Sequence, residues 1–178
     1  MKNILPLVIL LAGLSGAAGA SPEINTGVAT TINNFNELTF SHVAVQLPIA
    51  PDPYREWWRP DTWSVGYGRL SRDGNASNML MLGPLWRFDF LETVCNCFLD
   101  AGVSLTHLFE PDFYNEKRDR WESFGSHTQF TTRLGFGWYL DRQRQWAMSW
   151  NFSHISNGGL SEVNPGADFV GMELQFRY

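Results

Sequence analysis

Residues 145–178 alternate between apolar and polar side chains. From Val170 to Tyr178 every second residue is bulky and apolar, whereas the residues between them are Gly171, Glu173, Gln175 and Arg177. Residues 148–156 repeat the pattern, with Met148, Trp150 and Phe152 in alternate positions. Because strand side chains point alternately to two faces, both segments are predicted to be β-strands with one apolar face. The charged opposite face requires a wet interior or one in which charges are paired.

The same alternation recurs through the earlier chain. The expected strands cover residues 26–33, 37–47, 62–70, 79–90, 97–109 and 129–141, followed by the two final strands. The polar faces combine glycines with charges such as Arg87, Asp100, Arg133 and Glu173. The strand count is even and near eight, and the apolar faces suit contact with lipid. We therefore predict an all-β fold: an eight-stranded antiparallel transmembrane β-barrel with closed edges. A soluble lipocalin-type barrel is the alternative, and it would turn the apolar faces inward.

Three segments interrupt the alternation and are expected to connect strands. Residues 48–60 are rich in proline, residues 71–78 contain an Asp-Gly-Asn turn signal, and residues 110–125 are charged and polar. We expect the last of these segments to be a solvated loop.

The N-terminus has the features of a secretory signal. Lys2 precedes a short apolar segment, residues 4–14, and Ala18-Gly19-Ala20 provides a cleavage site. We therefore assign residues 1–20 to a signal peptide and residues 21–178 to one barrel domain. No later apolar run is long enough for a transmembrane helix. The chain is modestly acidic, with 18 acidic and 13 basic residues, which argues against a nucleic-acid partner.

Three polar residues interrupt the apolar faces of the two final strands: His154, Ser156 and Asp168. A hairpin with its tip near Ser161 would place His154 directly opposite Asp168, within side-chain reach. Ser156 would point outward beside His154. The three residues form a candidate triad of nucleophile, base and acid on the surface that faces lipid.

Two cysteines lie close together, Cys95 and Cys97. An exported protein experiences oxidising conditions, but a bridge across one residue suits a turn better than an extended strand. A strained bridge or an unbridged pair, without a catalytic role, is the main expectation, and a turn-locking disulfide is the alternative. No metal ligands cluster beside them.

The segment His154-Ile155-Ser156-Asn157 is followed by Gly159-Leu160, Asn164-Pro165-Gly166 and Asp168. This pattern resembles the lipid A 3-O-deacylase (PagL) family, whose signature is His-x-Ser-Asn with an acid fourteen residues after the histidine. Residues 83–90, 98–103 and 133–137 also look similar to family strands. The family acid is usually Glu, whereas this chain has the shorter Asp168. Glu162, in the loop, is the alternative acid.

The resemblance implies a bacterial outer-membrane esterase that removes the 3-hydroxyacyl chain from position 3 of lipid A. It implies lipid A or lipopolysaccharide of the outer leaflet as the partner, and it suggests a homodimer. Ser156 would attack the ester, His154 would transfer the proton, and Asp168 would orient the imidazole. Asn157 and the backbone N–H groups of Gly158 and Gly159 are candidates for binding the oxyanion.

No metal or other cofactor is expected, because residues 110–122 lack the spacing of a calcium loop. His42, His107 and His127 have no evident acidic partner and are interpreted as structural or interfacial. Three other functions remain open: an outer-membrane phospholipase-type acyl hydrolase, a non-catalytic scaffold barrel and a soluble lipocalin-like carrier.

Overall fold

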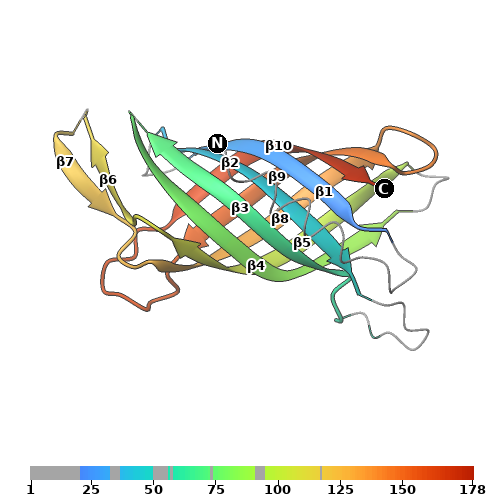
Figure 1. Cartoon of the computed structure of the whole chain (residues 1–178), viewed down its shortest axis with the longest axis horizontal. Coiled ribbons are helices and arrows are strands. Elements are labelled where there is room, and N and C mark those ends of the chain that lie inside the picture. Colours follow the sequence, from blue (N-terminus) through green and yellow to red (C-terminus); the bar gives the residue numbers. More distant parts are fainter. Residues whose placement is uncertain are drawn as a thin grey trace.

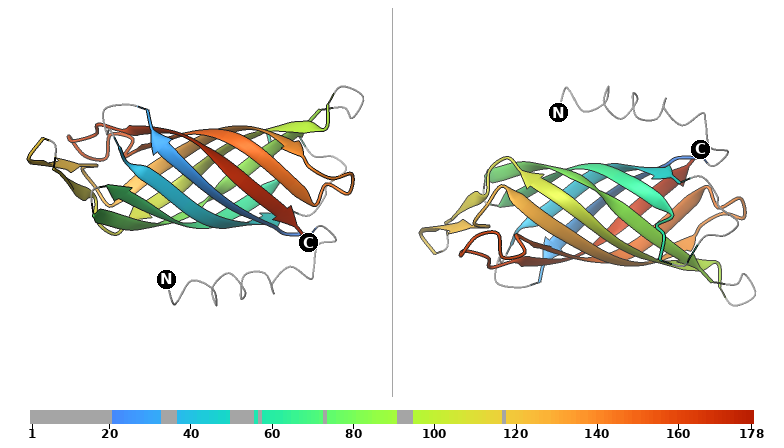
Figure 2. Two further views of the ribbon diagram at one scale, coloured as in Figure 1. Left: turned by 90° about the horizontal axis from the view of Figure 1, so that it is seen from above. Right: turned by 90° about the horizontal axis from the view of Figure 1, so that it is seen from below.

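Eight antiparallel strands close into a barrel, and a separate two-stranded hairpin extends from one end of it (Figures 1 and 2). The computed structural model describes residues 21–32, 37–49, 56, 58–72, 74–90, 95–116 and 118–178. The predicted signal peptide, residues 1–20, and most of the proline-rich segment 48–60 lie outside the described residues.

The barrel order is β1-β10-β9-β8-β5-β4-β3-β2, with β1 closing on β10. The barrel strands are β1 (Glu23–Thr31), β2 (Thr39–Pro48), β3 (Thr62–Arg72), β4 (Asn75–Asp89), β5 (Cys97–Leu108), β8 (Thr128–Tyr139), β9 (Trp146–Ser156) and β10 (Ala167–Arg177). The predicted eight-stranded antiparallel barrel is therefore confirmed. Within the described residues, no helix is long and apolar enough to cross a membrane.

The outer surface of the barrel is apolar. Leu82, Leu105, Leu134 and Trp150 are each more than half exposed, and further large apolar side chains on the barrel strands share this surface. The lumen instead buries polar side chains, such as Asn25, Gln46, Gln129 and Gln175. This distribution is that of a barrel with lipid outside and the reverse of a lipocalin-type barrel, so the carrier hypothesis is wrong.

Paired charges occupy the lumen, as the alternation predicted. Arg87 donates from Nη1 to Glu23 Oε2 and from Nε to Asp100 Oδ1, both at 2.8 Å. Arg133 Nη2 lies 2.8 Å from Glu173 Oε2. His42 Nε2 lies 3.0 Å from Glu173 Oε1. The sequence shows no acidic partner for His42 at a spacing like that of His154 and Asp168, and barrel closure through β1 supplies Glu173 by bringing β2 near β10.

One end of the lumen is closed by an apolar cluster instead of charges. Its fully buried members include Ile155 of β9 and Phe169 of β10, and the cluster also contains Phe113 and Phe124. Phe113 belongs to β6 (Asp112–Asn115), which pairs with β7 (Arg120–Ser123). The expectation of a solvated loop over residues 110–125 is therefore wrong. The segment forms a hairpin because its two phenylalanines pack under the barrel rim.

Two local expectations are refined by the structure. The predicted turn over residues 71–78 is shorter, since β3 reaches Arg72 and β4 begins at Asn75. Cys95 and Cys97 are joined by a disulfide at the start of β5, and the described residues contain no free cysteine.

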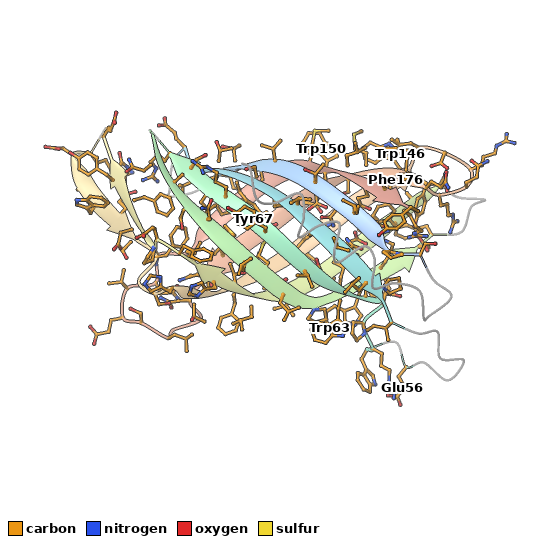
Figure 3. All side chains as sticks on the ribbon, viewed as in Figure 1. Glu56, Trp63, Tyr67, Trp146, Trp150 and Phe176 are labelled. Carbon is orange, nitrogen blue, oxygen red and sulfur yellow. A yellow bond between two sulfur atoms is a disulfide. The ribbon has the colours of Figure 1, made fainter. Side chains whose placement is uncertain are left out.

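Aromatic side chains surround the end of the barrel that holds the C-terminus. Figure 3 shows Trp63, Trp146 and Phe176 on the outer surface there, and the Trp146 and Phe176 rings lie 4.5 Å apart. Such a belt is typical of a membrane–water interface. Ser156 ends β9 at the opposite rim, where the apolar cluster and the β6–β7 hairpin lie (Figure 1).

Candidate active site

His154 and Asp168 face each other across β9 and β10. They are direct partners in the strand register, as a hairpin with its tip near Ser161 requires. The His154 Nδ1 and Asp168 Oδ1 atoms lie 2.6 Å apart. Their side chains are 39% and 30% exposed, so the pair sits on the outer surface and is accessible from it.

The neighbouring residues explain why these polar groups point outward. Ile155 follows His154, Phe169 follows Asp168, and both apolar side chains are fully buried in the cluster at the barrel end. Since side chains alternate along a strand, burying Ile155 and Phe169 holds His154 and Asp168 on the outer face. The apolar cluster therefore fixes the orientation of the candidate site.

Ser156 lies on the same outer face as His154, two residues further along β9. It is half-buried and pairs with Phe130 of β8. In the described part of the chain, no hydrogen bond joins Ser156 Oγ to His154. Because Nδ1 of His154 contacts Asp168, Nε2 is the ring atom available to a hydroxyl group. Of the candidate triad, the structure thus brings His154 and Asp168 into contact and places Ser156 beside them.

Asn157 is fully buried directly after Ser156. Its Nδ2 donates to the carbonyl oxygens of Phe124 at 3.2 Å and Val163 at 2.7 Å. Its Oδ1 accepts from Gly159 N, and its backbone N–H donates to Asn164 Oδ1. The side chain therefore ties the loop after β9 to the segment that follows β7. Donation to an oxyanion would require one of the two Nδ2 bonds to be exchanged.

The loop between β9 and β10 contains three glycines in the left-handed region, with φ of 63° at Gly158, 85° at Gly159 and 61° at Gly166. A Cβ atom added to Gly166 would lie 2.9 Å from His154 Cε1. Gly166 therefore lets the backbone lie against the imidazole. Glu162, the alternative acid, is exposed in this loop, whereas Asp168 already contacts His154.

His107 and His127 form a feature that sequence reasoning missed. Their rings stack with centroids 5.8 Å apart, and His127 Nδ1 lies 2.8 Å from the Leu108 carbonyl oxygen. The contact depends on the path of residues 108–128, which the strand alternation does not encode. In the part of the chain that the structure describes, no group of three His, Cys, Asp or Glu residues is placed to hold a metal ion.

The sequence profile of the lipid A 3-O-deacylase (PagL) family matches residues 41–177. The chain belongs to this family. It is similar to the lipid A deacylase PagL of Bordetella bronchiseptica (strain ATCC BAA-588 / NCTC 13252 / RB50), with 30% identity over 133 residues. The match covers 75% of this chain and 64% of that relative, slightly less than two thirds of the relative's length.

Two solved structures share the barrel fold. A crystal structure of the outer membrane enzyme PagL superposes with a TM-score of 0.63 at 18% identity, covering 86% of this chain and 98% of that one. A crystal structure of Neisserial surface protein A superposes with a TM-score of 0.52 at 9% identity, covering 89% and 96% of the two chains. At these identities, the likeness concerns the fold of this PagL-family chain.

Proposed function

We propose that this PagL-family protein is a bacterial outer-membrane serine esterase that removes the 3-hydroxyacyl chain from position 3 of lipid A. The observation that carries the proposal is the His154–Asp168 hydrogen bond on the apolar outer face of the barrel, with Ser156 on the same face. A base oriented by a carboxylate beside a hydroxyl group is the arrangement that nucleophilic ester hydrolysis requires.

In the proposed mechanism, His154 Nε2 accepts the proton of Ser156 Oγ as the oxygen attacks the ester carbonyl carbon. The tetrahedral intermediate collapses, the bond to the sugar oxygen breaks, and His154 returns the proton to that oxygen. Water then attacks the acyl-serine with the same base, releasing the 3-hydroxy fatty acid. Asp168 holds the imidazole in one tautomer and stabilises its protonated form.

The negative charge of the intermediate needs hydrogen-bond donors close to Ser156. We assign this role to backbone N–H groups of the glycine turn, with Gly158 first, because Gly159 N already donates to Asn157 Oδ1. The left-handed conformation at Gly158 is one that glycine adopts without strain. The Asn157 side chain would contribute to oxyanion binding by aligning this turn. It would donate directly only if substrate binding frees one of its two Nδ2 hydrogen bonds.

The position of the site suits a substrate that remains in the membrane. Below His154 and Asp168 on the same outer face lies a groove of about 550 Å³, whose lining includes Phe152, Val170, Leu134 and Trp150. Phe152 and Val170 are each two residues from a member of the pair, so the groove starts next to the site. An acyl chain can lie in it without leaving the bilayer.

The test is mass spectrometry of lipid A after incubation with the folded barrel. Wild type should release one 3-hydroxyacyl chain, and Ser156→Ala should release none. Ser153→Ala is the matched control, because Ser153 lies in the lumen on the same strand and is 7% exposed. No mass change with folded wild type, or full activity of Ser156→Ala, would overturn the proposal.

The same outward-facing groups could hydrolyse another membrane ester, so phospholipid vesicles form a second arm of the assay. Release of fatty acid from phospholipid but not from lipid A would favour the outer-membrane phospholipase alternative. A chelator added to that arm would reveal dependence on calcium. A barrel inactive on both substrates would favour the scaffold alternative. The homodimer remains a prediction, which chemical cross-linking in native membranes would test.

A further inference from the structure

A groove of about 530 Å³ lies at the rim of the barrel, between the β6–β7 hairpin and the loop after β9. Arg118, Arg120 and Trp121 line one wall, and residues 163–165 line the other. Both walls lie at the end of the barrel where Ser156 ends β9, as the neighbouring positions of the hairpin and this loop in Figure 1 show.

Direct hydrogen bonds link the groove to the candidate site. Asn164 lines the groove and accepts from the backbone N–H of Asn157, while the Val163 carbonyl accepts from Asn157 Nδ2. Asn157 is the residue after Ser156. A ligand in the groove would therefore contact the loop that follows the proposed nucleophile.

The arginines of this groove carry more positive charge than the single carboxylate that they contact can offset. Arg72 Nη1 lies 2.7 Å from Glu122 Oε2, and this pair is buried, with side chains 1% and 9% exposed. Arg118 and Arg120 contact the other oxygen of Glu122 at 3.1 and 3.4 Å. Three guanidinium groups thus share one carboxylate, while the nearby Asp119 accepts from the Tyr114 hydroxyl.

The two outer arginines remain accessible to a ligand. The Arg118 and Arg120 side chains are 42% and 60% exposed. Trp121, which follows Arg120, is 67% exposed, and exposed tryptophan is enriched at the headgroup level of a membrane. Arginine is suited to phosphate because its planar fork can donate two parallel hydrogen bonds to it.

We propose that this groove binds a phosphate group on the sugar headgroup of the lipid substrate, and that Arg118 and Arg120 determine specificity for the phosphorylated form. The inference rests on the proposed function, since lipid A is a phosphorylated and acylated sugar. Arg118 and Arg120 share one oxygen of Glu122, whose other oxygen contacts Arg72, so this single carboxylate does not offset the charges of both exposed arginines.

The experiment compares hydrolysis of bisphosphorylated lipid A with hydrolysis of the same lipid after removal of its phosphates, in mixed micelles at fixed ionic strength. Wild type should show a kcat/KM higher by about tenfold on the phosphorylated lipid, mainly through a lower KM. Arg118→Gln/Arg120→Gln should lose this preference and hydrolyse the two lipids with similar kcat/KM. Arg118→Lys/Arg120→Lys keeps the charge and should keep most of the preference.

The control is Arg142→Gln/Arg144→Gln, which removes the same charge from the turn between β8 and β9 at the opposite end of the barrel and should keep the preference. Heat-modifiable gel migration checks that each barrel is folded. If wild type hydrolyses both lipids equally, or if the Arg118/Arg120 variant retains the preference, the groove assignment is wrong while the esterase stands. If wild type hydrolyses neither lipid, the proposed function itself fails.

A further arm separates the lipid headgroup from free phosphate. Inorganic phosphate, compared with sodium chloride at equal ionic strength, should inhibit wild type only weakly because it lacks the acyl chains. Strong inhibition by phosphate that disappears in Arg118→Gln/Arg120→Gln, together with equal hydrolysis of the two lipids by wild type, would assign the groove to free phosphate and overturn the headgroup proposal.

Discussion

Asp168 contacts the imidazole of His154 at 2.6 Å, although the carboxylate is one methylene shorter than the glutamate usual in the family. The direct strand register supplies the closeness that the shorter side chain needs. We predict that Asp168→Asn lowers kcat by about 10²–10⁴, because an amide can stabilise the wrong tautomer of the imidazole. Asp168→Glu should retain more activity than Asp168→Asn, since it restores a carboxylate.

The measurement is kcat and KM for all three proteins on one lipid A preparation. Equal loss in Asp168→Asn and Asp168→Glu would show that side-chain length matters more than charge. An unchanged kcat in Asp168→Asn would remove Asp168 from the proposed triad.

A stability measurement can distinguish two roles of Asn157: anchoring the loop after β9 and binding the oxyanion. Asn157→Ala leaves the Phe124 and Val163 carbonyls without their side-chain donor, which should lower the free energy of unfolding by about 2–4 kcal/mol. Urea titration in detergent measures this change, and proteolysis within residues 157–166 should accelerate. Asn164→Ala, at an exposed residue that loses one bond, should cost clearly less. Unchanged stability with lost activity would instead support a direct oxyanion role for Asn157.

Side-chain partners were predictable only where the strand register defines them. His154 and Asp168 are fourteen residues apart in one hairpin, so alternation and the position of its tip were sufficient. His42 and Glu173 meet because β1 lies between β2 and β10 in the closed barrel. The sequence shows two polar faces there but does not show which groups share a level in the lumen.

Among the elements, the β6–β7 hairpin was the one that pattern reasoning missed. Its strands contain four residues each, too few to display alternation, and five acidic residues between positions 110 and 122 suggested solvent. The decisive residues are Phe113, within this charged stretch, and Phe124, just after it, and both are buried under the rim. They belong to a buried cluster that also contains distant residues such as Phe169, which local composition does not reveal.

The ionisation of Glu122 should make the stability of the β6–β7 hairpin depend on pH. Burial raises the pKa of its carboxyl group, but hydrogen bonds from Arg72 and Asn115 and the charges of Arg72 and Arg118 outweigh burial and lower the pKa below its usual range. A lowered folded-state pKa contributes stability that is present above the unfolded-state pKa and is lost as pH falls through the folded-state pKa.

We therefore predict that wild type unfolds at higher urea concentration than Glu122→Gln at neutral pH, and that the difference shrinks below about pH 4. Urea midpoints measured from pH 7 downward test this expectation. Asp112→Asn, at an exposed residue of the same hairpin, is the control and should show a smaller change. A difference between wild type and Glu122→Gln that is constant across the pH range would contradict the assigned ion pair.

For the whole molecule, one periodicity, the alternation of apolar and polar residues, predicted most of the architecture. Apolar alternation predicted about eight strands, their closure into a barrel and the outward position of the candidate triad. It also predicted charges in the lumen, which Arg87, Asp100 and Glu173 confirm. It did not predict the apolar end of the lumen, because Ile155 and Phe169 occupy positions that the rule assigns to polar residues. Their burial reflects the hairpin that covers that rim.

The apolar outer surface and polar lumen predict that the barrel is surrounded by lipid. Two leucines of similar exposure can test this. Leu134 lies in the middle of β8 and is 63% exposed, and Leu160 lies in the loop after β9 and is 61% exposed. If lipid surrounds the barrel, Leu134→Arg should lower the free energy of unfolding in liposomes by about 2–4 kcal/mol. Leu160→Arg, at a residue beyond the strands, should change it by less than about 1 kcal/mol. Equal effects at the two sites would mean that the apolar outer face does not contact the hydrocarbon core.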